Sequence, residues 1–146
     1  MADIVHGATG AQGSPVLSAL TSAGRTAIAA VRRPEAVPSG IATRQVDLAS
    51  ADSLTSTYEG ADGVFIHLPM GAPEVAAAQA RAVVEAVTRA HPGRVVISTS
   101  GQIIDQPDSP LQAAADSPIM TLIDGVTASG VPTAVVAPRL YLENLL

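Results

Sequence analysis

The sequence predicts an α/β domain built on a doubly wound parallel sheet of about six strands, with helices on both faces. Short apolar runs rich in β-branched residues recur along the 146 residues, and segments with helical periodicity separate them. Aromatic residues make up only 2% of the chain, so small aliphatic side chains must form the core, as in buried parallel strands. The alternation of strand and helix implies right-handed crossovers, most simply with the strand order 3-2-1-4-5-6.

The expected strands are the apolar runs between turns that contain glycine or proline. They span residues 3–6, 26–31, 43–48, 63–68, 94–99 and 133–138. The clearest helix covers residues 73–90, where one stripe is apolar and the opposite side carries charge. Gly24, Gly93 and Gly130 stand just past helical runs, where a left-handed cap is expected. We expect one core, and hence one domain over residues 1–146.

The charge balance and the missing residue types exclude several classes of function. The net charge is -5 and all 8 basic residues are scattered arginines, so no basic stripe is available for a nucleic-acid backbone. The absence of cysteine excludes disulfides and thiolate metal sites, and the histidines lack a metal-ligand spacing. No charged leader or apolar run of bilayer length is present, so we expect a cytoplasmic protein with no metal and no membrane partner.

The stretch "GATGAQG" at residues 7–13 follows the first strand and precedes a helical run. In a doubly wound sheet this turn lies at the carboxyl edge, where the helix N-terminus offers unpaired N–H groups to a phosphate. Gly7 would permit the sharp exit from the strand, Gly10 the close approach of a pyrophosphate, and Gly13 the packing of helix on strand. The context predicts a dinucleotide-binding Rossmann domain, the alternative being a purely structural turn.

The second strand ends in Arg32 and Arg33, which bear on the choice of dinucleotide. A carboxylate here would bind the ribose hydroxyls of NAD, whereas a guanidinium matches the 2'-phosphate of NADP. The pair therefore favours NADP(H) over NAD(H), the alternative being two solvated loop arginines. Asp47 and Leu48 close the third strand, where they would meet the adenine. Asp47 is equally suited to capping a helix that begins near Ser50.

Several motifs together resemble the NmrA-like group of atypical short-chain dehydrogenases. They are "GATGAQG", the arginine pair, "VDLAS", "GADGVFIHLPM", "RVVISTSG" and above all "SGVPTAVVAPRLYLENLL". The resemblance covers nearly the whole chain. It implies either NADPH-dependent reduction of quinones or other carbonyl compounds, or redox sensing in which the bound dinucleotide regulates a protein partner.

Carried over motif by motif, the resemblance implies three groups of cofactor contacts. The pyrophosphate would be lined by Gly7, Thr9, Gly10, Gln12 and Gly13. The 2'-phosphate would meet Arg32 and Arg33, and the nicotinamide ribose would be bordered by His67, Leu68 and Pro69.

The chain departs from the family pattern in two ways. Short-chain dehydrogenases usually carry Tyr-x-x-x-Lys on the helix after the fifth strand, but residues 109–130 contain neither residue and the chain has no lysine. Proton donation by that dyad is therefore excluded. The family's usual chain also continues into a smaller substrate subdomain, which we expect to be largely absent here. The apolar residues 140–146 would then need a cover, from a second copy or another partner chain.

Two side chains are candidates for catalysis. Ser100 follows the fifth strand, with Ser98 and Thr99, where dehydrogenases place a hydroxyl that binds the substrate carbonyl; local bonds to the loop backbone are the alternative. His67 ends the fourth strand and would shuttle a proton near neutral pH, unless it is hydrogen-bonded scaffold. His6, before the glycine turn, is interpreted as scaffold.

The sequence thus predicts an NADP(H)-binding oxidoreductase domain that passes a hydride to a small carbonyl or quinone substrate. A different class is left open: a non-catalytic dinucleotide sensor that acts through a protein partner. A third alternative is a degenerate scaffold that binds no dinucleotide.

Overall fold

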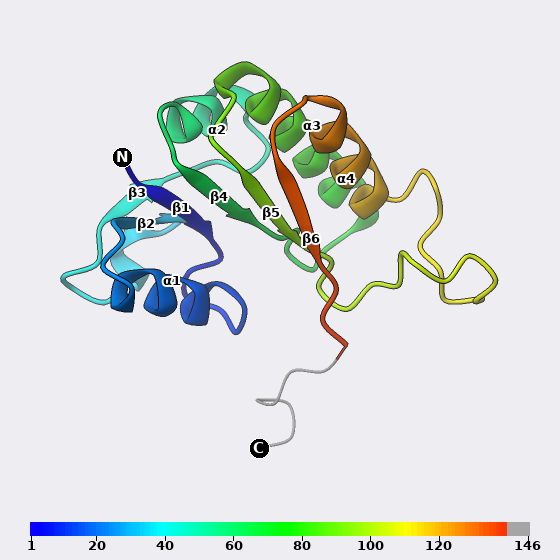
Figure 1. Cartoon of the computed structure of the whole chain (residues 1–146), viewed down its shortest axis with the longest axis horizontal. Coiled ribbons are helices and arrows are strands. Elements are labelled where there is room, and N and C mark those ends of the chain that lie inside the picture. The colour runs from blue at the N-terminus through cyan, green and yellow to red at the C-terminus, as the bar shows by residue number, and fades with distance from the viewer. Residues whose placement is uncertain (140–146) are drawn as a thin grey trace.

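The computed structural model describes residues 1–139, and they form one parallel sheet of six strands covered by helices (Figure 1). The strands lie in the order β3-β2-β1-β4-β5-β6, with every pair parallel, as the sequence predicted. Their bounds are β1 (Asp3–His6), β2 (Ala27–Val31), β3 (Thr43–Gln45), β4 (Gly63–Ile66), β5 (Val95–Ser98) and β6 (Thr133–Val136).

Four strands, β3 to β6, end earlier than expected, whereas β1 and β2 end where the sequence predicted. The apolar run 63–68, for example, leaves the ladder after Ile66, yet Leu68 is only 9% exposed. Likewise Thr99 lies beyond β5 but is fully buried. Hydrophobic patterning reports burial rather than the hydrogen bonds between strands, so it extends these strands into the first residues of the following loops. The loops that follow the strands form the carboxyl edge of the sheet. At this edge, the order of strands reverses between β1 and β4.

The helices divide unequally between the two faces of the sheet. One face carries α1 (Gly13–Ser22) and, in the connection from β2 to β3, only the short 3-10 helix η1 (Pro34–Ala36). The other carries α2 (Ala51–Tyr58), α3 (Pro73–Ala90) and α4 (Pro118–Ala128), which pack side by side (Figure 1). The larger core cluster lies beneath these three helices, and a smaller one lies between β1, β2 and α1.

Two of the three expected glycine caps are confirmed. Gly24 and Gly130 have φ of +75° and +81°, the left-handed conformation that ends a helix without steric cost. The expectation for Gly93 is wrong, because His91 takes the left-handed position after α3 with φ 49°. Gly93 is required for a different reason: a Cβ there would lie 2.5 Å from the backbone oxygen of Asp62.

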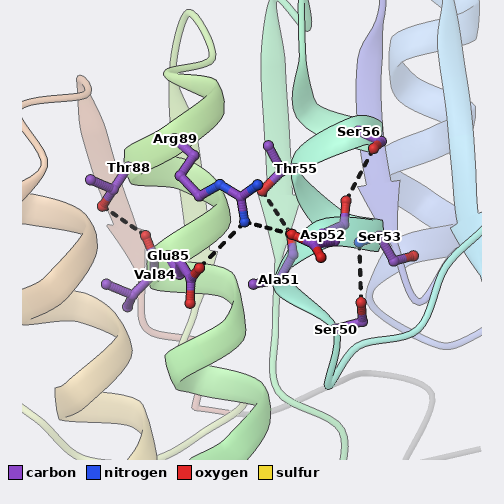
Figure 2. A network of polar contacts seen from close by, with 10 residues as sticks. All are labelled: Ser50, Ala51, Asp52, Ser53, Thr55, Ser56, Val84, Glu85, Thr88 and Arg89. Carbon is purple, nitrogen blue, oxygen red and sulfur yellow. Dashed lines mark hydrogen bonds and ion pairs between the residues drawn. The ribbon is translucent and has the colours of Figure 1, made fainter.

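Helix α2 is capped and tied to α3 by polar side chains (Figure 2). The Ser50 hydroxyl accepts the N–H of Ser53 at 3.2 Å, so Ser50 is the N-cap and the capping role considered for Asp47 is wrong. From α3, Arg89 donates to Asp52 of α2 at 2.8 Å and to Glu85 at 3.3 Å. These carboxylates are largely exposed, so both pairs add little stability; only the pair with Asp52 connects the two helices, since Glu85 lies in α3 itself.

Gly13 fixes the position of α1 against the end of β1. A Cβ at this residue would lie 2.3 Å from the carbonyl oxygen of Gly7 and 2.5 Å from that of His6. Both neighbours are backbone atoms that cannot move aside. The predicted packing role of Gly13 is therefore confirmed. Gly10, three residues earlier, has only the Gly7 oxygen nearby, at 3.4 Å from an added Cβ.

We predict that Gly13→Ala destabilises the domain by about 1–3 kcal/mol, because the added methyl group forces α1 away from β1. Urea unfolding followed by circular dichroism measures the change. Gly10→Ala is the matched control and should shift the free energy of unfolding by less than about 1 kcal/mol. Equal losses in the two variants would show that the close contact at Gly13 is not what positions the helix.

Candidate functional site

The glycine turn presents open backbone donors at the N-terminus of α1. Gly7 has φ +62°, which lets the chain turn sharply out of β1. The N–H of Gly10 donates to the Gly7 oxygen at 2.9 Å, and that of Ser14 to the Gly10 oxygen at 3.0 Å. Within residues 1–139, the N–H groups of Ala11, Gln12 and Gly13 have no protein acceptor. A helix N-terminus with free N–H groups is suited to an anionic group such as a pyrophosphate.

A cavity of about 400 Å³ opens beside this turn at the carboxyl edge of the sheet. Its walls come from the ends of β1, β2 and β4 and from the segment after β3. The lining residues are His6, Gly7, Thr9, Gly10, Ala30, Val31, Arg32, Arg33, Ala36, Val46, Leu48, His67 and Pro69.

Most of the residues expected to contact a cofactor line this one cavity. The structure brings together Gly7, Thr9, Gly10, Arg32, Arg33, Leu48, His67 and Pro69. The other expected residues lie outside its lining: Gln12, Gly13, Asp47, Leu68 and Ser100. Segments far apart in the sequence therefore converge where a doubly wound sheet places its ligand.

The two arginines after β2 are exposed at the rim of the cavity. The backbone oxygen of Arg32 accepts a hydrogen bond from the Gln45 amide at 3.2 Å, which holds this loop against β3. Asp47 is exposed, and its carboxylate accepts the N–H of Ala49 at 2.9 Å in the loop before α2. Free guanidinium groups beside open N–H groups fit a ligand with two separate phosphate positions.

His6 is a scaffold residue, as interpreted from the sequence. Its Nε2 lies 2.7 Å from the hydroxyl of Tyr58, and both side chains are buried. Burial, and secondarily the nearby His67, lower the pKa of His6 from 6.5 to about 4, while burial raises the pKa of Tyr58 well above its usual value. A neutral imidazole therefore joins β1 to α2 behind the glycine turn.

His67 lies over Gly7, so close that a Cβ on Gly7 would be 2.1 Å from its Nε2. This nitrogen is buried and has no hydrogen-bond partner within the described residues. Burial lowers the pKa of His67, so the side chain is neutral at neutral pH. An unpartnered nitrogen at the cavity wall fits a polar group of a bound molecule, such as a ribose hydroxyl.

The segment after β5 holds polar contacts that sequence reasoning missed. The Gln12 side chain hydrogen-bonds with Ser98 and Ser100 instead of facing the cavity. Ser100 has φ 54°, which is unusual for a residue other than glycine. Thr99 is fully buried, and its hydroxyl has no partner within residues 1–139. Only the three-dimensional proximity of α1 and β5 could reveal these contacts.

A larger cavity, of about 670 Å³, lies between α1 and the face of β4, β5 and β6 that α1 leaves open. Phe65, Val96 and Val136 form the sheet side, and Val16 and Leu20 form the helix side. It contains none of the arginines after β2 and touches the glycine turn only at Ala11 and Gln12. Despite its size, it is therefore a less suitable dinucleotide site than the smaller, polar cavity.

The described residues contain no cluster of three or more His, Asp or Glu side chains that could hold a metal ion. Within the same part of the chain, no helix combines the length and apolarity needed to cross a bilayer.

The chain belongs to the NAD(P)H-binding family, which it matches over residues 7–129. The match begins at the first glycine of the turn and ends one residue past α4. The expected dinucleotide-binding Rossmann domain is thereby confirmed, and with it the NmrA-like resemblance at the level of this family. No curated protein matches the chain.

Solved structures of reductases and epimerases share the fold. A triphenylmethane reductase from Citrobacter sp., complexed with NADP(H), has a TM-score of 0.82 and 20% identity, over 99% of this chain and 52% of the reductase. An NADPH-dependent quinone oxidoreductase from Escherichia coli, complexed with NADPH, has a TM-score of 0.75 and 23% identity, over 92% and 47%. A nucleoside-diphosphate-sugar epimerase from Staphylococcus aureus has a TM-score of 0.80 and 20% identity, over 99% and 53%. The chain spans about half the length of these proteins.

We predict that acid destabilises the fold through His6. Its pKa in the folded state, about 4, lies below the unfolded value of 6.5, so the unfolded chain binds the proton first. The contribution is complete above pH 6.5 and is lost as the pH falls toward 4, by about 3 kcal/mol in total. His67 acts in the same direction. Urea unfolding at a series of pH values measures the slope, and His6→Gln should flatten it. An unchanged slope in the variant would contradict a buried, neutral His6.

Proposed function

We propose that the chain is the NADP(H)-binding domain of an oxidoreductase that passes a hydride to a small carbonyl or quinone compound. The observation that carries the proposal is that the glycine turn and the two arginines after β2 line one cavity. Gly7, Thr9 and Gly10 line it on one side, and Arg32 and Arg33 line it on the other. The N–H groups of residues 11–13, which have no acceptor within residues 1–139, follow the turn directly. A pyrophosphate and a 2'-phosphate are the two charged positions that distinguish NADP from smaller nucleotides.

The proposed contacts follow the walls of the cavity. Backbone N–H groups of residues 11–13 would bind the pyrophosphate, and Arg32 and Arg33 the 2'-phosphate. Leu48 would flank the adenine, with Asp47 beside it in the same loop. His67 and Pro69 would border the nicotinamide ribose, with Leu68 buried beneath them. Because His67 is neutral, we assign it as a hydrogen-bond partner of that ribose rather than as a charged proton donor.

When bound, the reduced dinucleotide supplies the hydride, and a proton completes the conversion of the carbonyl into an alcohol or of a quinone into a hydroquinone. The Tyr-x-x-x-Lys dyad is absent, so the proton would come from water, and Ser100 would bind the substrate carbonyl. The triphenylmethane reductase and quinone oxidoreductase structures, complexed with NADP(H) and NADPH, support this class of reaction.

A non-catalytic dinucleotide sensor is the second candidate function. The observation that favours it is the complete absence of lysine, which removes the residue that usually holds the ribose and assists proton donation. Oxidation of NADPH in the presence of a panel of quinones, followed at the nicotinamide absorbance band, separates the two functions. Turnover supports the oxidoreductase, whereas tight binding without turnover supports the sensor.

We predict that the protein binds NADPH more tightly than NADH. Charge-assisted hydrogen bonds from Arg32 and Arg33 to the 2'-phosphate should be worth about tenfold in affinity at this exposed rim. Fluorescence titration should show that Arg32→Ala and Arg33→Ala each weaken the binding of NADPH but not the binding of NADH. Arg81→Ala, an exposed arginine of α3, is the matched control. Equal wild-type affinities for the two cofactors would overturn the NADP assignment, and failure of both to bind would support a scaffold without cofactor.

We further propose that a second copy of the chain covers the outer edge of the sheet. Strand β6 pairs only with β5 within the described residues, and Val135 and Val136 are 39% and 50% exposed. An unpaired edge with apolar side chains is a template for the same edge of another molecule related by a two-fold axis. The role expected for the apolar residues 140–146 lies outside the described residues.

Light scattering over a dilution series should accordingly give a mass about twice that of the chain at high concentration. Val136→Lys should weaken the association about tenfold, because a charge would be buried at the edge. Val75→Lys is the control, since Val75 is also 50% exposed but lies on α3. A wild type that remains monomeric at all concentrations would refute self-association.

A further inference from the structure

Three side chains form a closed ring of hydrogen bonds between the start of α1 and the end of β5. The Gln12 amide nitrogen lies 2.9 Å from the Ser100 hydroxyl, and its amide oxygen lies 2.5 Å from the Ser98 hydroxyl. The ring is completed by the backbone N–H of Ser100, which lies 3.2 Å from the Ser98 hydroxyl. It joins the glycine turn to a segment 86 and 88 residues further along the chain.

The direction of every bond in the ring follows from its groups of fixed character: the backbone N–H and the amide NH₂ group can only donate, and the amide oxygen can only accept. The N–H of Ser100 donates to the Ser98 oxygen, so the Ser98 hydroxyl is free to give its own hydrogen to the Gln12 amide oxygen. The Gln12 NH₂ group must then be the donor to the Ser100 oxygen. Ser100 therefore accepts within the ring, and its hydroxyl hydrogen remains available for an outside acceptor.

The ring also holds Ser100 in a conformation that serine rarely adopts. Its φ is 54° and that of Gly101 is 88°, so two successive residues are left-handed. For a residue with a Cβ this conformation is unfavourable, and it persists only when surrounding contacts enforce it. Ser98, 3% exposed, anchors the ring in the end of β5.

The available hydroxyl belongs to a segment that leaves the sheet at the same edge as His67, and Ser100 itself lines neither of the two cavities. In the sheet, Ile66 of β4 pairs with Ile97 of β5, so the segments that begin at His67 and Thr99 leave neighbouring strands at the same edge. His67 Nε2 and the Thr99 hydroxyl, each without a partner within the described residues, mark this edge as incompletely satisfied by the protein itself. A carbonyl acceptor on a ligand suits the hydroxyl groups at this edge.

We propose that Gln12 is a positioning residue that presets the Ser100 hydroxyl as a hydrogen-bond donor to a carbonyl oxygen at the nicotinamide end of the site. The inference rests on the proposed function, and it replaces the pyrophosphate contact expected for the Gln12 side chain. The carbonyl belongs either to the carboxamide of the nicotinamide or to the substrate, two sources with the same acceptor chemistry.

The test compares two probes that differ only at the nicotinamide: NADP⁺ and 2'-phospho-ADP-ribose. Gln12→Leu breaks the ring, and Ser100→Gly removes the hydroxyl while permitting the left-handed backbone. If the carboxamide is the acceptor, each variant should weaken the binding of NADP⁺ about fivefold and leave the binding of 2'-phospho-ADP-ribose unchanged. If the substrate is the acceptor, NADP⁺ affinity is unchanged and each variant instead lowers kcat for the reduction of menadione by NADPH about fivefold.

A role of Gln12 through Ser100 has a signature that a general structural role lacks. The double variant should be no worse than either single variant, because both remove the same bond. Gln102→Leu, an exposed amide two residues from Ser100, is the matched control and should have no effect. The proposal is overturned if neither the affinity for NADP⁺ nor kcat changes in the variants. It is also overturned if the losses of the two single variants add in the double variant.

Failure of the proposed function has a different outcome from failure of this inference. A wild type that binds neither probe refutes the dinucleotide site and, with it, the acceptor proposed for Ser100. If the wild type binds both probes and the variants have the same affinity for NADP⁺ and the same kcat, only the role of Gln12 is refuted. Slow amide exchange of Ser100 in the ligand-free protein, accelerated in Gln12→Leu, reports that the ring forms.

Discussion

The close contact between the start of α1 and the end of β1 is the constraint on which the rest of the site depends. Gly13 packs against the carbonyl oxygens of Gly7 and His6 at distances that leave no room for a Cβ. Gly7 is left-handed and lies beneath His67. With these contacts, the N–H groups of residues 11–13, which have no acceptor within residues 1–139, directly follow the turn residues that line the cavity. A wider separation would move the helix N-terminus away from the arginines after β2.

Polar side chains behind and beside the turn are arranged so that none carries a charge into the core. His6 meets the hydroxyl of Tyr58, and burial keeps the imidazole neutral at neutral pH. His67 is neutral for the same reason. The positive charge of the site comes instead from exposed arginines, whose solvation costs little in the absence of a ligand. The proposed anion site would therefore rely on backbone N–H groups and rim guanidinium groups, not on buried cations.

The two faces of the sheet are covered unequally by helices. Three helices bury one face, whereas α1 and η1 leave β4, β5 and β6 partly open on the other, where the larger cavity lies. The solved reductases and epimerases are about twice as long and share only this half. The open apolar face is therefore the part of this domain where a second copy or further protein surface has room to pack.

Local residue patterns by themselves determined the fold class, the strand order and the glycine turn. Apolar periodicity, glycine and proline report on burial and backbone conformation within a few residues, which is why residues 73–90 were assigned to a helix with correct bounds. The same locality explains the errors at Gly93 and Asp47. His91 takes the left-handed cap position after α3, and the hydroxyl of Ser50, not Asp47, accepts the N–H of Ser53.

Tertiary structure decided which of the expected side chains line the cavity, and it alone decided what they bond to. Gln12 could be placed in the glycine turn from sequence, but its partners Ser98 and Ser100 are brought to it only by the pairing of β4 with β5 beside β1. The neutral state of His67 likewise depends on burial by residues distant in sequence. Hydrogen-bond partners and pKa values are set by atoms within a few ångströms in space, and a residue's neighbours along the chain supply only some of them.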